Sequence, residues 1–333
     1  MKVICLGRGK LGYVTISKIL EKGYEVPVIV TTQHTPNVEM CSDDFKSLSK
    51  KYNIPFFYTK NINDKFFVDM FTKFTADIAV ALLWVHVIQN KIIETTRLGF
   101  LNIHPGEDLP HYRGNATTNW ALIKNEQKIG LCVHFMEPGV LDSGDIVAQR
   151  YIDLTPQTTI GDITKQIITM GSDMVIEALD LLSTGKAQPQ KQNYSQGIRN
   201  YPRIPQDGEI CWTQSVEQID RHIRSVSEPF PGAFTFIGGR KLYIWAAHPF
   251  KNPPIYLGVP GHVVGFHDDN TISVLTGHGG ILILDTVQIE GDEKVKPAEI
   301  IRSIRVRLGM NCSEEILQLK NRVERLEKRH FLI

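Results

Sequence analysis

The sequence predicts an α/β protein whose first part holds a doubly wound, mostly parallel sheet and whose second part is a smaller β-barrel domain. Short apolar runs alternate with helical patterns as far as residue 183, which is typical of parallel strands joined by helices. A polar stretch that contains Pro189 and Pro202 then resembles a linker. After it, short β-rich runs are mostly separated by glycine-containing turns, a pattern that favours a small barrel.

The first part is expected to form a Rossmann-like domain at residues 1–187. Strands are predicted at 1–6, 27–30, 55–58, 77–83, 99–104, 128–136 and 146–154. Helices are predicted at 13–22, 43–52, 64–73, 90–96, 116–124 and 159–183. We expect Asn63 and Thr158 to cap two of these helices, since such side chains accept hydrogen bonds from free backbone N–H groups. We also expect Pro105-Gly106 to end the strand before it sharply.

The second part is expected to follow a linker at 188–204 and to form an OB-like β-barrel domain at 205–333. A helix is predicted at 215–226, followed by strands at 242–247, 261–266, 271–275 and 281–289. In the tail, Ile316, Leu319, Val323 and Leu326 recur at helical spacing. We expect this stripe to pack against the chain's own barrel, with a second subunit, and so a homodimer, as the alternative.

Charge and cysteine content narrow the classes of function. The chain has 37 basic and 36 acidic residues, so it carries no large positive excess for a phosphate backbone. Its five cysteines lack the spacing of a metal site or a disulfide framework, which favours a reducing cytoplasm. No signal peptide and no apolar run long enough to cross a bilayer is found. His104, His111 and His134 lack tight ligand spacing, so no metal is expected.

A glycine-rich turn follows the first strand. Gly7, Gly9 and Gly12 satisfy G-x-G-x-x-G, which taken literally predicts a nicotinamide-dependent oxidoreductase. The acid expected at the end of the second strand is missing, because that strand runs into Thr-Thr-Gln. We therefore favour a turn that faces phosphate or substrate, with Arg8 and Lys10 as anion contacts. A purely structural turn with two solvated basic side chains is the equal alternative.

A second group of polar residues surrounds a later strand end. Asn102 and His104 are two residues apart on a strand, so their side chains project from the same face. That edge of an open α/β sheet is where ligands usually bind. Asp142 lies about forty residues later in a probable loop. Together an amide, an imidazole and a carboxylate supply an oxyanion donor, an acid or base and a group that orients it, which suits acyl transfer.

The wider pattern resembles the 10-formyltetrahydrofolate-dependent formyltransferases. The resemblance rests on the runs Asn102-Ile103-His104-Pro105, Leu109-Pro110-His111-Tyr112-Arg113-Gly114 and Leu141-Asp142-Ser143-Gly144-Asp145. The runs Asp207-Gly208-Glu209-Ile210-Cys211-Trp212 and Pro229-Phe230-Pro231-Gly232-Ala233-Phe234-Thr235 resemble the family's C-terminal domain. The resemblance implies that Asn102, His104 and Asp142 are the catalytic trio and that 10-formyltetrahydrofolate is the formyl donor. Whether His104 acts as a base or as a protonated oxyanion donor stays open.

The resemblance also implies where the donor binds. Trp84, Val87, Ile88 and Gln89 match in position the loop that holds the folate pteridine in this family, largely through main-chain hydrogen bonds, and Asp142 completes the donor site. From the residues alone, a place in the core is the favoured interpretation of Trp84, Val87 and Ile88.

The acceptor is predicted from departures from the family pattern. Residues 31–40 hold no lysine or arginine where tRNA-binding members have a basic insertion, and Gly106-Glu107-Asp108 adds negative charge at the acceptor mouth. We therefore expect an amino sugar linked to dTDP or UDP, as in surface-glycan synthesis, with Arg8, Lys10, Tyr112 and Arg113 as contacts. A methionyl-tRNA formyltransferase is the main alternative, and a binding module without catalysis is the fallback.

Overall fold

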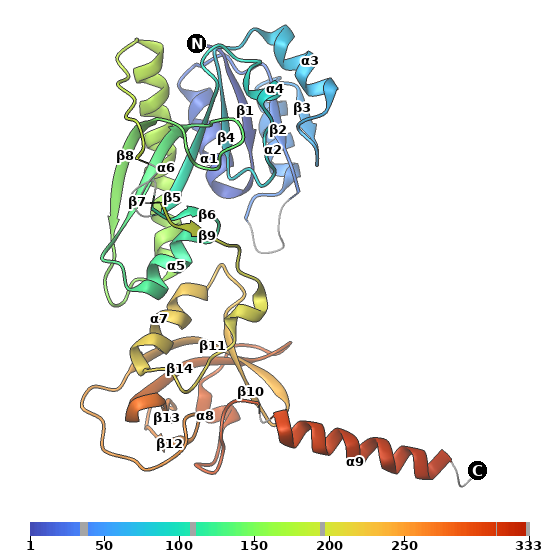
Figure 1. The fold of residues 1–333 in the computed structure, drawn as a ribbon, viewed down its shortest axis with the longest axis vertical. Helices are drawn as coiled ribbons and strands as arrows, with labels where there is room; N and C mark the ends of the chain where they lie inside the picture. The colour runs from blue at the N-terminus through green and yellow to red at the C-terminus, as the bar shows by residue number, and fades with distance from the viewer. Residues whose placement is uncertain (34–38, 107–110, 194–196, 311, 331–333) are drawn as a thin grey trace. The chain divides into compact units, whose positions relative to one another are not determined.

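The computed structural model describes residues 1–33, 39–106, 111–193, 197–310 and 312–330 of the chain (Figure 1). Contacts divide it into two compact units, Met1–Arg203 and Ile204–Ile333. This division falls within the segment 188–204 that the sequence marks as a linker. Each unit is described by itself below.

The first unit is built on a seven-stranded sheet in the order β3-β2-β1-β4-β5-β7-β8. The strands are β1 (Val3–Gly7), β2 (Ile29–Thr31), β3 (Phe56–Tyr58), β4 (Ile78–Leu82), β5 (Phe100–Gly106), β7 (Lys128–Phe135) and β8 (Ile146–Asp153). The pairings from β3 to β5 are parallel, and β7 and β8 continue the sheet antiparallel. A separate parallel pair joins β6 (Arg113–Gly114) and β9 (Arg199–Asn200). The predicted Rossmann-like, mostly parallel α/β class is confirmed.

Helices cover both faces of this sheet (Figure 1). They are α1 (Gly9–Glu21), α2 (Ser42–Lys51), α3 (Lys65–Phe74), α4 (Asn90–Ile93), α5 (Thr117–Lys124) and α6 (Ile160–Ser183). The two predicted caps were wrong by one residue. Asp64 caps α3, where its side chain accepts from the N–H of Phe66, and Thr159 caps α6 in a capping box with Asp162.

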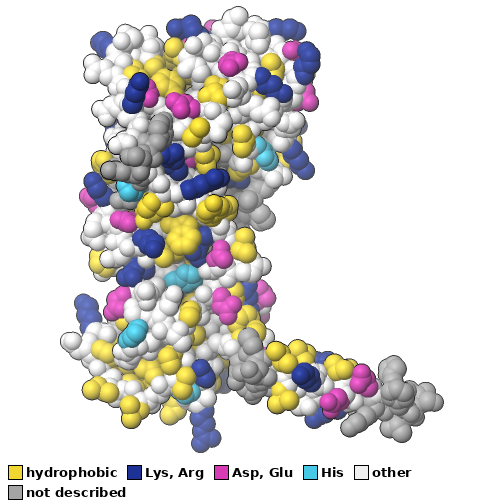
Figure 2. All heavy atoms as spheres, viewed as in Figure 1, with side chains coloured by type: hydrophobic (Ala, Val, Ile, Leu, Met, Phe, Trp, Pro, Cys, Tyr) yellow, Lys and Arg dark blue, Asp and Glu magenta, His cyan; other side chains and the backbone are white. Residues whose placement is uncertain are grey.

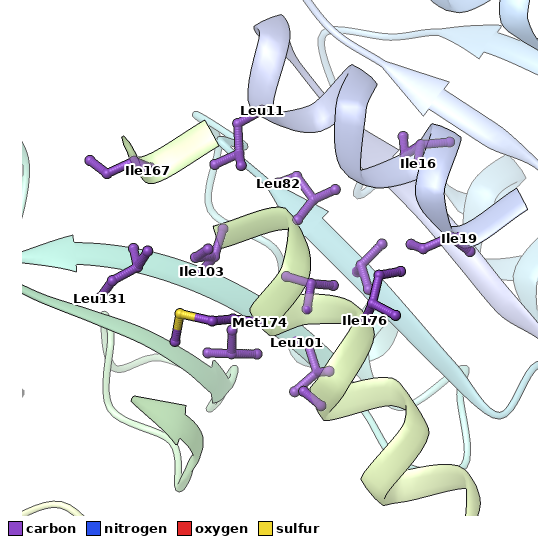
Figure 3. Close-up of a cluster of buried hydrophobic side chains, with 14 of the residues drawn as sticks. Leu11, Ile16, Ile19, Leu82, Leu101, Ile103, Leu131, Ile167, Met174 and Ile176 are labelled. Atoms are coloured by element: carbon purple, nitrogen blue, oxygen red, sulfur yellow. The ribbon is translucent and has the colours of Figure 1, made fainter. Parts of the chain in front are cut away.

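The larger core fills the sheet face covered by α1 and α6. Figure 3 shows Ile103 and Leu131 of the sheet in one cluster with Leu11 of α1 and Met174 of α6. α6 approaches β5 closely at Gly171, where a Cβ would lie 2.5 Å from Cδ1 of Ile103. A glycine is therefore required for this helix to pack on this strand.

The strand β5 differs from its prediction at Pro105-Gly106. The strand does not end there but continues to Gly106, and these two residues pair with Leu131 and Gly130 of β7. The pairing with β4 stops at Asn102. Beyond that point β5 has no partner on the β4 side, so the missing N–H of proline costs no ladder bond.

The helix α1 also begins earlier than predicted, at Gly9 rather than at residue 13. The turn after β1 is therefore tight, with Arg8 as the residue before the helix. A Cβ at Gly7 would lie 2.8 Å from Cδ1 of Ile16, and one at Gly12 would lie 3.1 Å from the backbone of Gly7. These two glycines allow the strand and the helix to pack closely.

The second unit is built on a five-stranded antiparallel sheet in the order β10-β11-β14-β13-β12. Its strands are β10 (Ala233–Ile237), β11 (Arg240–Pro249), β12 (Val263–Phe266), β13 (Ile272–Leu275) and β14 (Ile281–Ile289). Its helical segments are η2 (Pro205–Gly208), α7 (Val216–Val226), η3 (Gly277–Gly279), α8 (Pro297–Ile300) and α9 (Cys312–His330). Trp212 is buried in its core, where the indole N–H donates to the hydroxyl of Thr235 at 2.9 Å.

The prediction that the apolar stripe of α9 packs against the chain's own barrel was wrong. Ile316, Leu319, Val323 and Leu326 are 53%, 58%, 52% and 51% exposed. Figure 2 shows apolar side chains at the surface of this helix. Among the described residues, no helix has the length and apolar character needed to cross a membrane.

Candidate active site

Two polar side chains project from one face of β5 at the edge where its pairing with β4 ends. Asn102 and His104 alternate with Ile103, which points into the core on the other face. Asn102 is partly exposed, whereas the side chain of His104 is 6% exposed. The sequence prediction that these two residues share a face is consistent with this alternation.

Asp142 lies at the centre of a polar cluster with these residues. Its Oδ2 is 3.5 Å from Nδ1 of His104, and its Oδ1 is 3.5 Å from Nδ2 of Asn102. His134 joins them, with Nε2 at 3.9 Å from Asp142 Oδ1 and at 3.3 Å from Asn102 Nδ2. We call Asn102, His104, His134 and Asp142 the Asp142 cluster.

The loop between β7 and β8 holds Asp142 in place. The residue has a φ of 51°, in the left-handed region where Asp is more common than most residues. Its Oδ2 accepts a 2.9 Å hydrogen bond from the N–H of Gly114. Gly114 has a φ of 100°, and a Cβ there would lie 2.5 Å from the carbonyl oxygen of Asn200. A glycine is therefore needed for this backbone to reach the carboxylate.

Both ring nitrogens of His104 face acceptors. A carbonyl oxygen can only accept, so Nε2–H donates to the carbonyl oxygen of Tyr112 at 2.8 Å. Nδ1 faces the Asp142 carboxylate. A doubly protonated His104 would thus have an acceptor within the described chain for each N–H.

His134 is the residue that the sequence analysis missed, having considered it only as a metal ligand. It lies opposite Asn102 in the β5–β7 register and is buried, with 1% of its side chain exposed. Burial lowers the pKa of His134 to about 4, although the Asp142 carboxylate opposes this shift. The ring is therefore neutral near pH 7. Its Nδ1–H donates to the carbonyl of Phe135 at 2.7 Å, which leaves Nε2 as an acceptor facing the amide nitrogen of Asn102.

This geometry fixes the orientation of the Asn102 amide. Nδ2 of Asn102 faces two acceptors, His134 Nε2 and the Asp142 carboxylate, so the amide is held with its donor end toward the cluster. A buried carboxylate is costly unless donors surround it, and here it has Gly114 N–H, Asn102 and His104 around it. The cluster combines a preorganised N–H donor with an imidazole, as stabilisation of an oxyanion requires.

The predicted donor loop follows β4, directly beside β5. In this loop Val87 and Gln89 are exposed, whereas Ile88 is 3% exposed and packs in the core. Trp84 packs partly against the same core. Nε1 of Trp84 and Nε2 of His86 are shielded from solvent without a hydrogen-bond partner in the described part of the chain, so both are available to a polar ligand.

Two side chains from elsewhere in the sequence fasten this loop. Asn63 donates from Nδ2 to the carbonyl of Val87 and accepts at Oδ1 from the N–H of Gln89, both at 2.8 Å. Arg8 donates from Nε to the carbonyl of Leu83 at 3.2 Å. The sequence analysis assigned Asn63 to a helix cap and Arg8 to an anion, and it found neither contact.

The other predicted acceptor contacts have different surroundings, and the structure records a contact with the cluster for Tyr112. Lys10 forms a 2.5 Å ion pair with Glu39. Tyr112 is 6% exposed and donates from its hydroxyl to Glu126 at 2.8 Å, so the part of Tyr112 that reaches the cluster is its carbonyl. Arg113 lies in β6 and is partly exposed. The predicted acidic mouth falls largely on residues 107–110, which lie outside the described residues, as do residues 34–38 of the stretch without basic side chains.

Two surface hollows of about 470 and 500 Å³ lie away from the Asp142 cluster. The first is lined by α6 together with Lys22 and Arg150, and the second lies between α1 and α2. Neither contains the convergence of donors and acceptors described above, so we place the candidate site at the cluster. Within the described residues no group of three or more His, Cys, Asp or Glu side chains is arranged to hold a metal ion.

Family models match both units of the chain. A model described as formyl transferase matches residues 1–179, and a model described as formyl transferase, C-terminal domain, matches residues 203–305. The chain is also 28% identical over 314 residues to methionyl-tRNA formyltransferase of Syntrophus aciditrophicus, which covers 93% of this chain and 98% of the relative.

Solved structures share the fold at lower identity. An N-formyltransferase from Helicobacter canadensis, solved with folinic acid and dTDP-3-aminofucose, superimposes with a TM-score of 0.62 at 15% identity, over 85% of this chain and 98% of that one. HypX from Aquifex aeolicus, solved with tetrahydrofolic acid, gives 0.59 at 18% identity, over 91% of this chain and 47% of that one.

Proposed function

Because this chain belongs to the formyl transferase family, we propose that it transfers a formyl group from 10-formyltetrahydrofolate to a primary amine at the Asp142 cluster. The observation that carries the proposal is that Asn102 and His104 both face the buried carboxylate of Asp142 at the edge of the sheet. The donor supplies the formyl carbon and, in N10, the leaving nitrogen.

The chain's own residues divide the chemistry between them. One N–H of Asn102 Nδ2 stays on neutral His134, which keeps the amide in the productive orientation. The other N–H is proposed to leave its long 3.5 Å contact with Asp142 and to donate to the formyl oxygen as it becomes negative. Nε2–H of His104 is held by the carbonyl of Tyr112, so Nδ1, at 3.5 Å from Asp142, is the ring nitrogen proposed to exchange a proton with the substrate. As the amine nitrogen bonds to the formyl carbon and the bond to N10 breaks, one proton leaves the amine and one is taken up by N10. Neutral His104 is proposed to receive the amine proton at Nδ1 and then to return a proton to N10.

The donor is proposed to bind on the loop at residues 83–89, where Trp84, Val87, Ile88 and Gln89 lie. The unpaired Nε1 of Trp84 and the exposure of Val87 and Gln89 support this assignment. Asn63 fixes the backbone of this loop, so its main-chain groups are preorganised for hydrogen bonds to a heterocycle. Two structural neighbours were solved with folate-type ligands, tetrahydrofolic acid and folinic acid.

As acceptor we propose an amino sugar carried on a nucleoside diphosphate. The support is the absence of lysine and arginine from residues 31–40 and the acidic pair Glu107 and Asp108. Arg8, Lys10, Tyr112 and Arg113 are the proposed contacts, of which Arg8 and Lys10 are cations near the start of α1. The structural neighbour solved with dTDP-3-aminofucose has an acceptor of this class.

Methionyl-tRNA is the second candidate acceptor. The observation that favours it is the 28% identity to a methionyl-tRNA formyltransferase over 93% of the chain. Binding to tRNA would weaken steeply with salt because phosphate contacts release counterions, whereas a nucleotide sugar would show a shallow dependence.

The experiment is a parallel assay of the full chain with 10-formyltetrahydrofolate. One arm offers dTDP- and UDP-linked amino sugars, the other offers methionyl initiator tRNA, and mass spectrometry detects the gain of one formyl unit. We expect formylation of an amino sugar, abolished in Asn102→Ala. If the tRNA alone is formylated, methionyl-tRNA and not an amino sugar is the acceptor. If Asn102→Ala formylates its acceptor as fast as the wild type, the site is not at the Asp142 cluster.

A further inference from the structure

The exposed stripe of α9 has the spacing of a coiled coil. Ile316, Leu319, Val323 and Leu326 follow one another at intervals of three, four and three residues, which is the heptad pattern. Each side chain is more than half exposed in the second unit. A 19-residue helix that leaves such a stripe in water gains little of the packing from which helices in proteins draw most of their stability.

The residue types on the stripe favour two helices over a larger bundle when the helices run parallel. Ile316 and Val323 occupy the first apolar position of the heptad, and Leu319 and Leu326 occupy the second. A β-branched residue at the first position with leucine at the second favours two parallel strands over larger bundles. The partner that meets these requirements best is the same helix from another copy of the chain.

Charges beside the stripe support the same pairing. In a parallel coiled coil, the residue before the first apolar position faces the partner residue five positions further along. Glu315 would then face the partner's Lys320, and Arg322 would face the partner's Glu327. Both contacts join opposite charges.

We propose that α9 joins two copies of this chain as a parallel two-stranded coiled coil. Over residues 315–327 three acidic side chains balance three basic ones, which disfavours an anionic membrane or a nucleic acid as the partner of this helix. The proposal goes beyond the formyl-transfer function, because it involves neither the Asp142 cluster nor the donor loop.

The first test is the mass of the full chain in solution. Light scattering during size exclusion, at high micromolar concentration, should give about twice 37.7 kDa. Leu319→Glu with Leu326→Glu should give the monomer mass with unchanged activity per molecule, because both side chains are exposed in the single chain and lie outside the Asp142 cluster and the donor loop. Asn321→Glu, on the outer side of the helix, is the matched control and should stay dimeric. A monomeric wild type, or a double variant that remains dimeric, would overturn the proposal.

The second test exploits the charge pattern. Arg322→Glu and Glu327→Arg should each weaken the dimer about fivefold, because like charges then face each other. The doubly reversed chain, and an equimolar mixture of the two single variants, should regain wild-type affinity. Equal dimerisation by all of these chains would contradict the register proposed here.

A third test fixes the orientation and excludes other partners. Leu326→Cys should form a disulfide-linked dimer on oxidation, because equivalent positions meet in a parallel pair, whereas Asn321→Cys should not cross-link beyond the wild-type level. An antiparallel pair would leave both variants uncross-linked and refute the parallel arrangement. If the wild type co-sediments with phosphatidylserine vesicles and the variant with Leu319→Glu and Leu326→Glu does not, the stripe binds a lipid surface and the proposal is refuted.

Discussion

The strands β1 and β5 flank β4 in the same sheet, yet different residue types follow or form their carboxyl ends. The end of β1 uses glycines, and a Cβ at Gly7 would collide with Ile16. The end of β5 uses polar side chains, which surround the buried carboxylate of Asp142. The glycines after β1 let a helix pack closely on the strand. The polar side chains at the end of β5 bury a carboxylate, which costs desolvation free energy and does not improve packing. A glycine fingerprint is therefore weaker evidence of a ligand than a buried polar cluster.

The largest expected effect comes from breaking the β5 end. Asn102→Ala, His104→Ala and Asp142→Asn should each lower kcat ~10²- to 10³-fold, because each removes a donor or the group that aligns one. Because these variants also change a buried hydrogen-bond network, Tm should fall as well, so kcat is expressed per folded molecule. Steady-state kinetics and Tm together test this. Near-native turnover in all three variants would remove the distinction between the two strand ends.

The second largest effect is expected on stability, from adding a methyl group at the carboxyl end of β1. Gly7→Ala should lower the free energy of unfolding by ~1–3 kcal/mol, because the methyl group must displace Ile16, while kcat per folded molecule stays unchanged. Gly265→Ala is the control, since its methyl would meet only Ser273 at about 3.6 Å. Denaturant unfolding gives the free energies. A stable Gly7→Ala chain with lost activity would make this turn a functional site after all.

A third measurement sharpens the account of the β5 end through pH. The pKa of His134 is lowered to about 4 in the folded chain, below its ordinary value of 6.5. The unfolded chain therefore binds the extra proton first, and stability should fall as pH drops from about 6.5 to about 4, by up to ~1.4 kcal/mol per pH unit. His134→Gln should flatten this part of the stability curve. An unchanged curve would mean that the buried ring does not titrate as described.

The smallest effect is expected from a change to the donor loop, which follows β4, the strand between β1 and β5. Asn63→Ala removes both side-chain hydrogen bonds to the donor loop, so KM for 10-formyltetrahydrofolate should rise by about tenfold with a smaller change in kcat. Lys60→Ala, an exposed residue of the same connection, serves as the control. An unaltered KM would show that the loop keeps its shape without Asn63.

Periodicity predicted the fold class because strands and helices of the first unit have clear apolar patterns, and it correctly paired Asn102 with His104 on one face. It missed the extension of β5 through Pro105, since a proline is compatible with a strand wherever one side lacks a partner, and pairing is not visible locally. It also misplaced the cap of α3, because Asn63 and Asp64 are both good caps and only the backbone geometry distinguishes them.

His134 could not be predicted for a different reason. Its place beside Asn102 depends on the antiparallel register of β5 with β7, across 32 residues of chain. Had that register been known, the alternation of β7 would have placed His134 on the reacting face. The contacts of Asn63 with the donor loop are similarly non-local.

The close approach of α6 to β5 at Gly171 has a consequence for how this enzyme can diversify. Ile103 lies between Asn102 and His104 in the strand, and its side chain packs beside α6 at Gly171. A larger residue at position 171 would move Ile103 and, through the strand backbone, the two polar side chains on the other face. Random libraries that alter this contact should yield inactive clones. Libraries confined to the surrounding loops should change which amine is accepted while the carbonyl chemistry persists.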